Sequence, residues 1–423
     1  MSTPLTTSLT AQDTAPRRTV RPAVAILICT TVTVMEGYSL IVYGSVIPLL
    51  LTDRGLGLDT GTVGLVGSVI YVGMLAGALV AGVIGDRFGH QPVLLAGIGL
   101  FIAGFVVTGV AGDVPVLALA RLLSGLGVGG AITTALTLAR AHAPRNRASL
   151  VVNITMAGIP LGGALTALIG LAVLPHLGWR PMFFIGAALT LVIFAVVFLT
   201  PLELRAPSAP GREPPATGST GPLARMFRTR GVLVAALVAA VAVPNMFTWF
   251  GLNVWLTAAM TALDYPLTSA LLFSFTLTAG AVCGSLIAAP LADRFGALRT
   301  AVVTSLLTVA GLAGVVAGSR SLPLLLVCVA LMGAGGHTTE NLLNAAAGDL
   351  YPAPIRGTVM GWSNGLSYIG AVGPVVGGLV IGSGLGAYGV FVLFGCSACI
   401  VVVTLLALAR AVRSRPAAPA DGL

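Results

Sequence analysis

The stretch Gly85-Asp86-Arg87-Phe88-Gly89 follows an apolar run over about 62–84, and Asp293-Arg294-Phe295-Gly296 follows a second apolar run over about 268–290. The two copies are 207 residues apart (293 − 86). Arginine-bearing stretches after later runs repeat at an offset of 209 (356 − 147), and two Gly-Gly pairs repeat at 215 (377 − 162). Three ordered matches at a nearly constant offset indicate that one unit of several helices is duplicated.

Working outward from these motifs, the composition defines the environment of the chain. Of its 423 residues, 57% are hydrophobic and only 8% are charged, and the mean hydropathy is +1.01. Soluble domains carry about 25% charged residues, so this composition excludes a soluble enzyme, a nucleic-acid-binding protein and a disordered protein. We expect a lipid bilayer around the chain and no nucleic-acid partner.

Apolar runs of the roughly 20 residues that a spanning helix needs recur about twelve times. The sequence therefore predicts an all-α membrane protein with twelve transmembrane helices in two six-helix repeats. The expected parts are a cytoplasmic tail at 1–22, bundles at 23–200 and 231–410, a cytoplasmic linker at 201–230 and a cytoplasmic tail at 411–423. Parallel six-helix halves with a site between them at the bilayer midplane are a transporter architecture.

The arginines predict the orientation. Eighteen of the 22 arginines (22 − 4) fall in the two tails or in alternate loops. Because positive residues mark the cytoplasmic side, we expect both termini in the cytoplasm and a multi-pass location in the cell membrane.

All 22 basic residues counted as Lys or Arg are arginines. A phosphate-binding loop with its lysine is therefore excluded, as is Schiff-base chemistry. We expect no cofactor, no metal site and no enzymatic reaction, and we expect the proton gradient to supply the energy.

Motifs in several spans resemble those of the major facilitator superfamily along essentially the whole chain. Gly85–Gly89 resembles its loop motif between the second and third helices, and Arg121–Gly127 resembles its fourth-helix motif. Gly373-Pro374-Val375-Val376-Gly377-Gly378 resembles a helix-bending motif of the superfamily. In the first span, Glu36-Gly37-Tyr38-Ser39 resembles the Asp-Gly-Tyr-Asp signature of the aromatic acid:proton symporter family.

The resemblance to that family implies proton-coupled uptake of benzoate-like carboxylates. Two positions differ from the family pattern. Ser39 stands where the signature has its second carboxylate, and Tyr368 stands where the eleventh helix of the family has an arginine. Fewer charged groups at these positions also fit a less anionic substrate.

Ionisable residues inside the spans are the first functional candidates, because each costs about 3 kcal/mol to insert. Glu36 is expected near the midplane and is interpreted as the proton site, with a structural hydrogen-bonded carboxylate as the alternative. Arg121 is expected to bind an anionic substrate or to form a fixed ion pair. Glu340 shares a helix face with His337, Asn341 and Asn344 and is a second proton-site candidate.

The expected substrate-binding residues combine aromatic walls with amide and hydroxyl groups, which suits a planar ring with polar substituents. Besides Arg121 they are Tyr38, Ser39, Trp249, Asn253, Asn341, Trp362 and Tyr368. Packing or anchoring at the membrane interface is the alternative for each aromatic residue.

Charged residues at the cytoplasmic helix ends are expected to form gating ion pairs that hold the outward-open state and break as the halves rock. They are Asp86, Arg87, Arg147, Asp293, Arg294 and Arg356.

Together these features predict a monomeric secondary transporter that imports a small organic acid, such as a hydroxybenzoate, together with protons. Efflux of drugs or metabolites by proton antiport is the alternative, because Pro160-Leu161-Gly162-Gly163 partly resembles a fifth-helix motif of antiporters. A non-transporting nutrient sensor is the third reading.

Overall fold

The computed structural model describes residues 20–144, 148–202, 222–318, 321–351 and 356–414, and the regular elements within these ranges are helices. The first half contains α1 (Pro22–Leu50), α2 (Thr60–Phe88), α3 (His90–Val110), α4 (Val114–His142), α5 (Ala148–Met156), α6 (Gly158–Leu177) and α7 (Arg180–Leu199). The second half contains α8 (Pro222–Ala262), α9 (Leu267–Phe295), α10 (Ala297–Val316), α11 (Leu322–Asp349), α12 (Arg356–Ser367), η2 (Tyr368–Ala371), α13 (Val372–Val380), η3 (Ile381–Leu385) and α14 (Gly386–Ser414).

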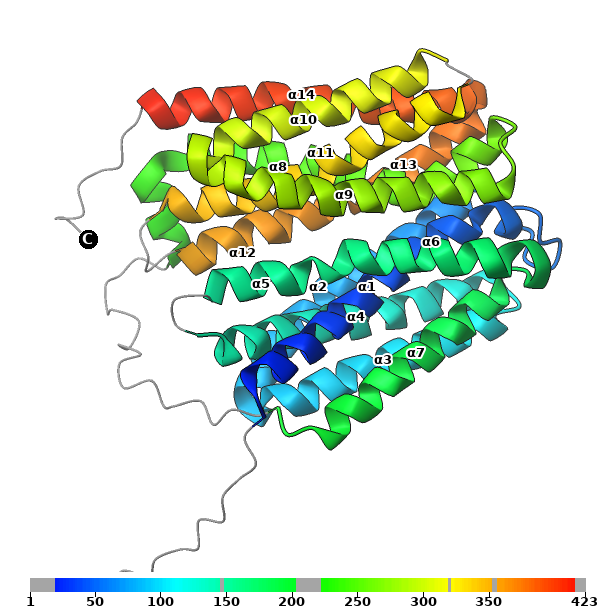
Figure 1. The fold of residues 1–423 in the computed structure, drawn as a ribbon, viewed down its shortest axis with the longest axis horizontal. Helices are drawn as coiled ribbons and strands as arrows, with labels where there is room; N and C mark the ends of the chain where they lie inside the picture. Colours follow the sequence, from blue (N-terminus) through cyan, green and yellow to red (C-terminus); the bar gives the residue numbers. More distant parts are fainter. Residues whose placement is uncertain (1–19, 145–147, 203–221, 319–320, 352–355, 415–423) are drawn as a thin grey trace, which may run out of the picture.

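Eleven segments of the described chain are long and apolar enough to cross a membrane, and the last of them, Gly365–Arg413, has 49 residues. At about 1.5 Å per residue this segment is more than twice as long as the ~30 Å hydrocarbon core is thick. The chain reverses within it, where Gly384 (φ 88°) and Gly386 (φ 63°) adopt backbone conformations that favour glycine. Figure 1 shows α13 and α14 as separate helices on the two sides of this reversal. The all-helical fold with twelve crossings is therefore confirmed.

The duplicated Asp-Arg-Phe-Gly motif has the same local structure in both halves. Gly89 ends α2 with φ 94°, and Gly296 ends α9 with φ 90°. Each glycine donates its backbone N–H to the carbonyl four residues earlier, at 3.0 Å and 2.8 Å. The next helix begins directly afterwards, at His90 and at Ala297. The repeated Asp-Arg-Phe-Gly sequence is thus a repeated helix stop.

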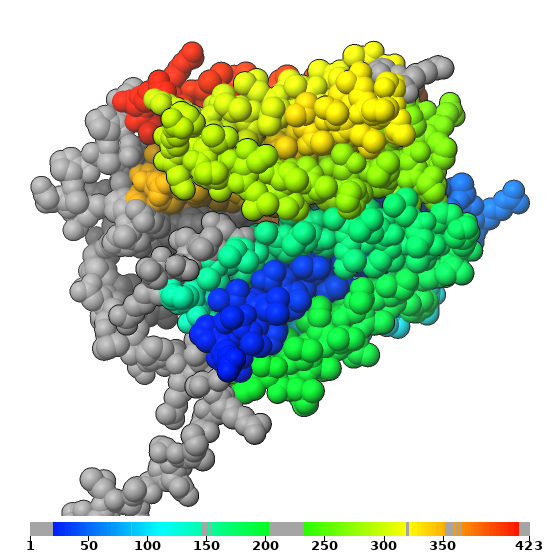
Figure 2. Space-filling model, viewed as in Figure 1, coloured from blue at the N-terminus to red at the C-terminus, as the bar shows by residue number. Residues whose placement is uncertain are grey.

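The helices form two bundles, α1 to α7 in one and α8 to α14 in the other (Figure 1). Large apolar side chains such as Val83 and Leu199, 75% and 78% exposed, cover the outside, as expected of a surface that faces lipid. The bundles meet along α6 and α9 in the space-filling view (Figure 2). We call the end that holds the α1–α2 turn the outer end, and the end where α1 begins and α14 finishes the inner end.

The expected linker at 201–230 lies partly outside the described residues. Helix α8 begins at Pro222, so it includes the last part of that stretch. Helix α14 continues to Ser414, a few residues past the expected end of the second bundle.

Candidate functional site

Arg121 is a buried cation on α4, with 1% of its surface exposed. Its Nη1 donates a hydrogen bond to the Ser39 backbone oxygen at 3.4 Å, and its guanidinium carbon lies 4.6 Å from the centre of the Tyr43 ring. The Nε atom has no hydrogen-bond partner. Within the described ranges no carboxylate lies close enough to form an ion pair with it, so the fixed ion pair weighed as an alternative is not seen there.

Two tyrosines of the first half lie near this cation, and one of them contacts the second half. Tyr43 on α1 lies beneath the guanidinium and donates its hydroxyl to the Val63 carbonyl at 2.9 Å. Tyr71 on α2 lies within electrostatic range of Arg121 and packs against Phe250 of α8, with ring centres 4.1 Å apart. Because α2 and α8 belong to different halves, the Tyr71–Phe250 contact crosses the interface between the bundles. A cation and aromatic faces together suit a small aromatic anion.

Glu36 lies about halfway along the 29-residue α1 and is 4% exposed. Its Oε2 atom has no hydrogen-bond partner, so the hydrogen-bonded structural carboxylate weighed as an alternative is not seen for this atom. A cavity of about 10 Å³, room for about one water molecule, lies beside it, and Thr190 is the only other polar residue in its lining. Tyr368, from η2 in the other half, lies within electrostatic range of Glu36.

Two other residues of the first-span signature have different surroundings. Ser39 is fully buried, and its Oγ has no hydrogen-bond partner, while its backbone oxygen accepts from Arg121. Tyr38 donates its hydroxyl to the Met182 carbonyl at 2.7 Å and packs edge-on against Phe105. Met182 and Phe105 lie within the first half. Tyr38 therefore packs inside one bundle, whereas Ser39 lies beside Arg121.

Glu340 on α11 is held by donors from neighbouring helices. Its Oε1 accepts from the Ser367 hydroxyl at 2.6 Å, and its Oε2 accepts from Asn245 Nδ2 at 3.3 Å. Asn245 also donates to the Gly336 carbonyl at 3.1 Å. The carboxyl group thus connects α8, α11 and α12 within the second half.

The expected aromatic and amide residues of the second half lie in different places. Trp249 packs against His337, with ring centres 5.3 Å apart, and Asn253 donates to the Trp249 carbonyl at 2.7 Å. The Oδ1 atom of Asn253 is buried without a hydrogen-bond partner. Asn341 is half-buried. Trp362 packs against a separate apolar cluster that includes Val234, Leu343 and Leu405, so its own packing is with the second bundle.

The expected gating residues form no ion pair within the described part of the chain. Arg87, Asp293 and Arg294 are exposed, and each arginine lies over the phenylalanine that follows it, at 5.4 Å (Phe88) and 5.2 Å (Phe295). The side chains of Asp86 and Arg356, and all of Arg147, lie outside what the structure describes.

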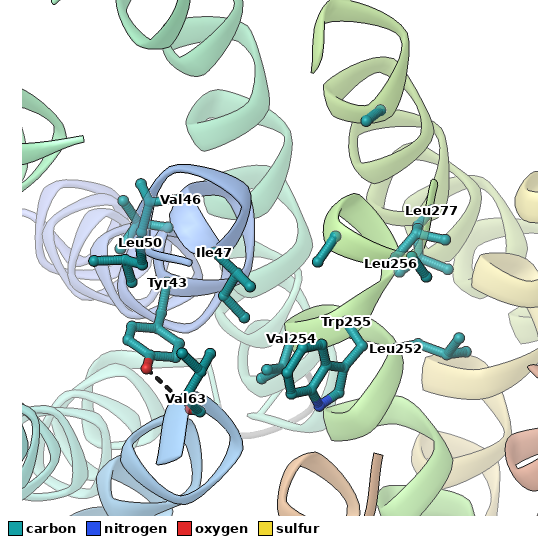
Figure 3. Close-up of a cluster of buried hydrophobic side chains, with 14 of the residues drawn as sticks. Tyr43, Val46, Ile47, Leu50, Val63, Leu252, Val254, Trp255, Leu256 and Leu277 are labelled. Atoms are coloured by element: carbon teal, nitrogen blue, oxygen red, sulfur yellow. Dashed lines mark hydrogen bonds between the residues drawn. The ribbon is translucent and has the colours of Figure 1, made fainter. Parts of the chain in front are cut away.

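The halves are closed together at the outer end. The Ser68 hydroxyl of α2 donates to the Ala371 carbonyl at 2.6 Å. Gly44 of α1 lies against the backbone of Asn253 and Val254 on α8, and Gly64 of α2 lies against Pro374. Figure 3 shows this region, in which Ile47 of α1 points toward Val254 of α8 and the Tyr43 hydroxyl bonds to the Val63 carbonyl. These contacts between the halves, which we call the outer seams, lie nearer the outer end than Tyr71 and Phe250 do.

Sequence reasoning missed Tyr43 and Tyr71 at the site, and Asn245 and Ser367 around Glu340. Tyr43 follows Glu36 by seven residues, about two turns on the same helix face, so its spacing could have identified it. Tyr71 and Phe250 are 179 residues apart (250 − 71), and neither span carries a signal of this contact.

Comparisons with known proteins agree with this architecture. The gentisate transporter of Corynebacterium glutamicum is 31% identical over 408 residues, covering 92% of this chain and 88% of that protein. The gallate transporter of Pseudomonas putida is 29% identical over 429 residues (93% and 94%), and the benzoate transport protein of Acinetobacter baylyi is 25% identical over 412 residues (90% and 88%).

Among solved structures, an inward-facing bacterial homologue of the human lysosomal transporter Spinster superposes with a TM-score of 0.76 at 16% identity, covering 94% of this chain and 98% of that one. A D-xylose–proton symporter superposes with a TM-score of 0.75 at 16% identity (92% and 97%). A family model described as Major Facilitator Superfamily matches residues 28–286 and 245–422. The chain therefore belongs to the Major Facilitator Superfamily, a family of transporters rather than enzymes.

Proposed function

We propose that this transporter imports a small aromatic carboxylate together with protons across the cell membrane. The observation that carries the proposal is Arg121, a fully buried guanidinium with an unpartnered Nε and no protein counter-ion within the described residues. The names of the gentisate, gallate and benzoate relatives support an aromatic acid as the substrate.

The buried charge of Arg121 explains why an anion is favoured. Guanidinium stays charged in proteins, and an uncompensated buried charge is costly. A substrate carboxylate would supply the missing counter-ion and accept two parallel N–H bonds. The guanidinium carbon lies 4.6 Å from the centre of the Tyr43 ring, and a cation–π contact of this kind stabilises the charged group.

We assign the coupling proton to Glu36 rather than to Glu340. Glu36 has an oxygen without a hydrogen-bond partner and lies beside an apolar cavity, where a neutral acid costs less than an isolated carboxylate. Both oxygens of Glu340 accept hydrogen bonds, which stabilises the charged form in place. Glu36 is therefore the carboxyl group whose protonation changes more readily during transport.

The direction of access follows from the closed outer end and from the arginine distribution. If both termini are cytoplasmic, as the positive-inside rule predicts, the outer seams face away from the cytoplasm. The structure then corresponds to a state closed to the outside, and the exposed Arg87, Asp293 and Arg294 to gating residues released from their partners.

The test uses purified protein in liposomes with labelled benzoate and an imposed inward proton gradient. Wild type is expected to accumulate benzoate against its gradient. Glu36→Gln is expected to lose this accumulation and to keep exchange of external for internal benzoate, whereas the matched Glu340→Gln keeps accumulation. Full proton-driven accumulation in Glu36→Gln would overturn the assignment of the proton, and proton-driven exit of substrate would replace symport with antiport.

A further inference from the structure

The Tyr71–Phe250 pair lies between the two halves and is tied to the anion site on one side. Its ring centres are 4.1 Å apart with an angle of 31° between the planes. Tyr71 is 1% exposed, while Phe250 is half-buried. The accessible aromatic surface of the pair therefore belongs to Phe250.

The exposed surface of Phe250 faces the interface between the bundles rather than lipid. Phe250 precedes Asn253 and Val254 by three and four residues, so the three lie on one face of α8. Asn253 and Val254 on that face contact Gly44 of α1. Tyr71 and Phe250 lie 11 and 12 residues from the outer ends of their helices, or roughly 17 Å deep, close to the midplane.

The hydroxyl of Tyr71 is available for a ligand. It makes no hydrogen bond to any described residue, in contrast to the hydroxyl of Tyr43, which is bound to the Val63 carbonyl. Tyr71 also lies within electrostatic range of both Arg121 and Tyr368. An aromatic face, a free phenol and a cation thus lie close together.

We propose that Tyr71 and Phe250 form the subsite that recognises the substrate ring and so determine the preference for aromatic over aliphatic acids. This inference rests on the proposed function, because it needs the substrate carboxylate to be at Arg121. The ring packs against Phe250, and the Tyr71 hydroxyl bonds to a hydroxyl substituent on the ring. Since the two residues come from different halves, a bound ring contacts both bundles at once.

The test compares benzoate with cyclohexanecarboxylate, an acid of similar size and charge without an aromatic ring. Aromatic pairing predicts that Phe250→Leu lowers the preference for benzoate by about 2- to 10-fold, measured as the ratio of inhibition constants against labelled benzoate uptake. Phe250→Tyr, which keeps the ring, retains the preference. Phe247→Leu is the matched control, because Phe247 lies one turn away and packs against Phe394 inside the second half.

Tyr71→Phe keeps the ring and removes only the hydroxyl, so it is expected to lower the preference for gentisate over benzoate by about 2- to 10-fold. An unchanged benzoate-to-cyclohexanecarboxylate ratio in Phe250→Leu would overturn the ring subsite. A loss of preference in Phe250→Tyr equal to that in Phe250→Leu would also overturn it. Failure of wild type to take up either acid would instead refute the proposed function.

Discussion

Gly44 lies at a close approach of the two halves, and replacing it with alanine is expected to open the outer end. A Cβ at this position would overlap the Asn253 carbonyl oxygen and lie 3.0 Å from Val254 Cα, where ordinary contact begins at 3.4 Å. Both neighbours are backbone atoms of α8, so no side chain can move aside. The clash is relieved only when α1 and α8 separate, by about an ångström.

Overpacking of this kind costs about 1–3 kcal/mol. This cost destabilises only the state in which the two halves touch. A difference of about that size shifts a two-state equilibrium about 5- to 150-fold. Gly44→Ala should therefore depopulate the outer-closed state. Spin labels at Arg54 and Asp264, exposed residues near the outer ends of the two halves, should report a longer distance by pulsed electron spin resonance.

Two glycines of the first half provide matched controls. A Cβ on Gly129 would overlap the Met74 carbonyl, which belongs to the same half, so Gly129→Ala should lower thermal stability without changing the label distance. A Cβ on Gly99 would meet nothing within 4 Å, so Gly99→Ala should change neither. A Gly44→Ala protein that folds normally and keeps the closed distance distribution would refute the proposal that this seam closes the outer end.

Three further predictions concern single polar groups. Arg121→Lys is expected to raise the half-saturating benzoate concentration about tenfold or more, because ammonium neither stacks on Tyr43 nor binds a carboxylate in bidentate fashion; unchanged initial uptake rates at low benzoate would contradict this. Glu340→Gln should cost about 1–3 kcal/mol of stability through its weakened hydrogen bonds, seen as a lower melting temperature in detergent. At the outer end, the hydrogen bond from Trp179 and the nearby Arg180 hold the pKa of Asp53 below its ordinary value. A carboxyl group whose pKa is lower in the folded than in the unfolded state stabilises the fold at pH values above its unfolded-state pKa. This contribution is lost as the pH falls through its folded-state pKa. Asp53→Asn should therefore lower the melting temperature at pH 7 by more than at pH 3, and an equal effect at both pH values would contradict the assignment.

The fold was predictable because each of its determinants is local. Span length and apolar content identify helices in sequence, and the reversal between the last two spans falls at Gly384 and Gly386. The repeated Asp-Arg-Phe-Gly motif predicted equivalent positions in the two halves because the glycine that ends a helix acts within a few residues. The start of α8 was less predictable, since the stretch before Arg230 is rich in residues that are also common in linkers.

Within the proposed site, charged residues carry the clearest signal in the sequence. Arg121 and Glu36 stand out in apolar spans because their burial is costly, and the structure places both deep in the bundle. Aromatic residues carry no such signal, because packing, lipid contact and ligand contact all suit them. Tyr38 was expected at the site and packs inside the first half, whereas Tyr71 was overlooked and contacts the other half.

Helix α1 joins the proposed site to the proposed gate. Within nine residues it carries Glu36, the Ser39 carbonyl that accepts from Arg121, the Tyr43 ring beneath that guanidinium, and Gly44 at the seam with α8. A helix is stiff over so short a distance, because its backbone hydrogen bonds link each turn to the next. Separation of α1 from α8 at Gly44 therefore displaces Tyr43 and Ser39 relative to the second half. Opening of the outer end and access to Arg121 are then one motion, and a substrate that bridges Arg121 and Phe250 stabilises the closed arrangement through contacts with both halves.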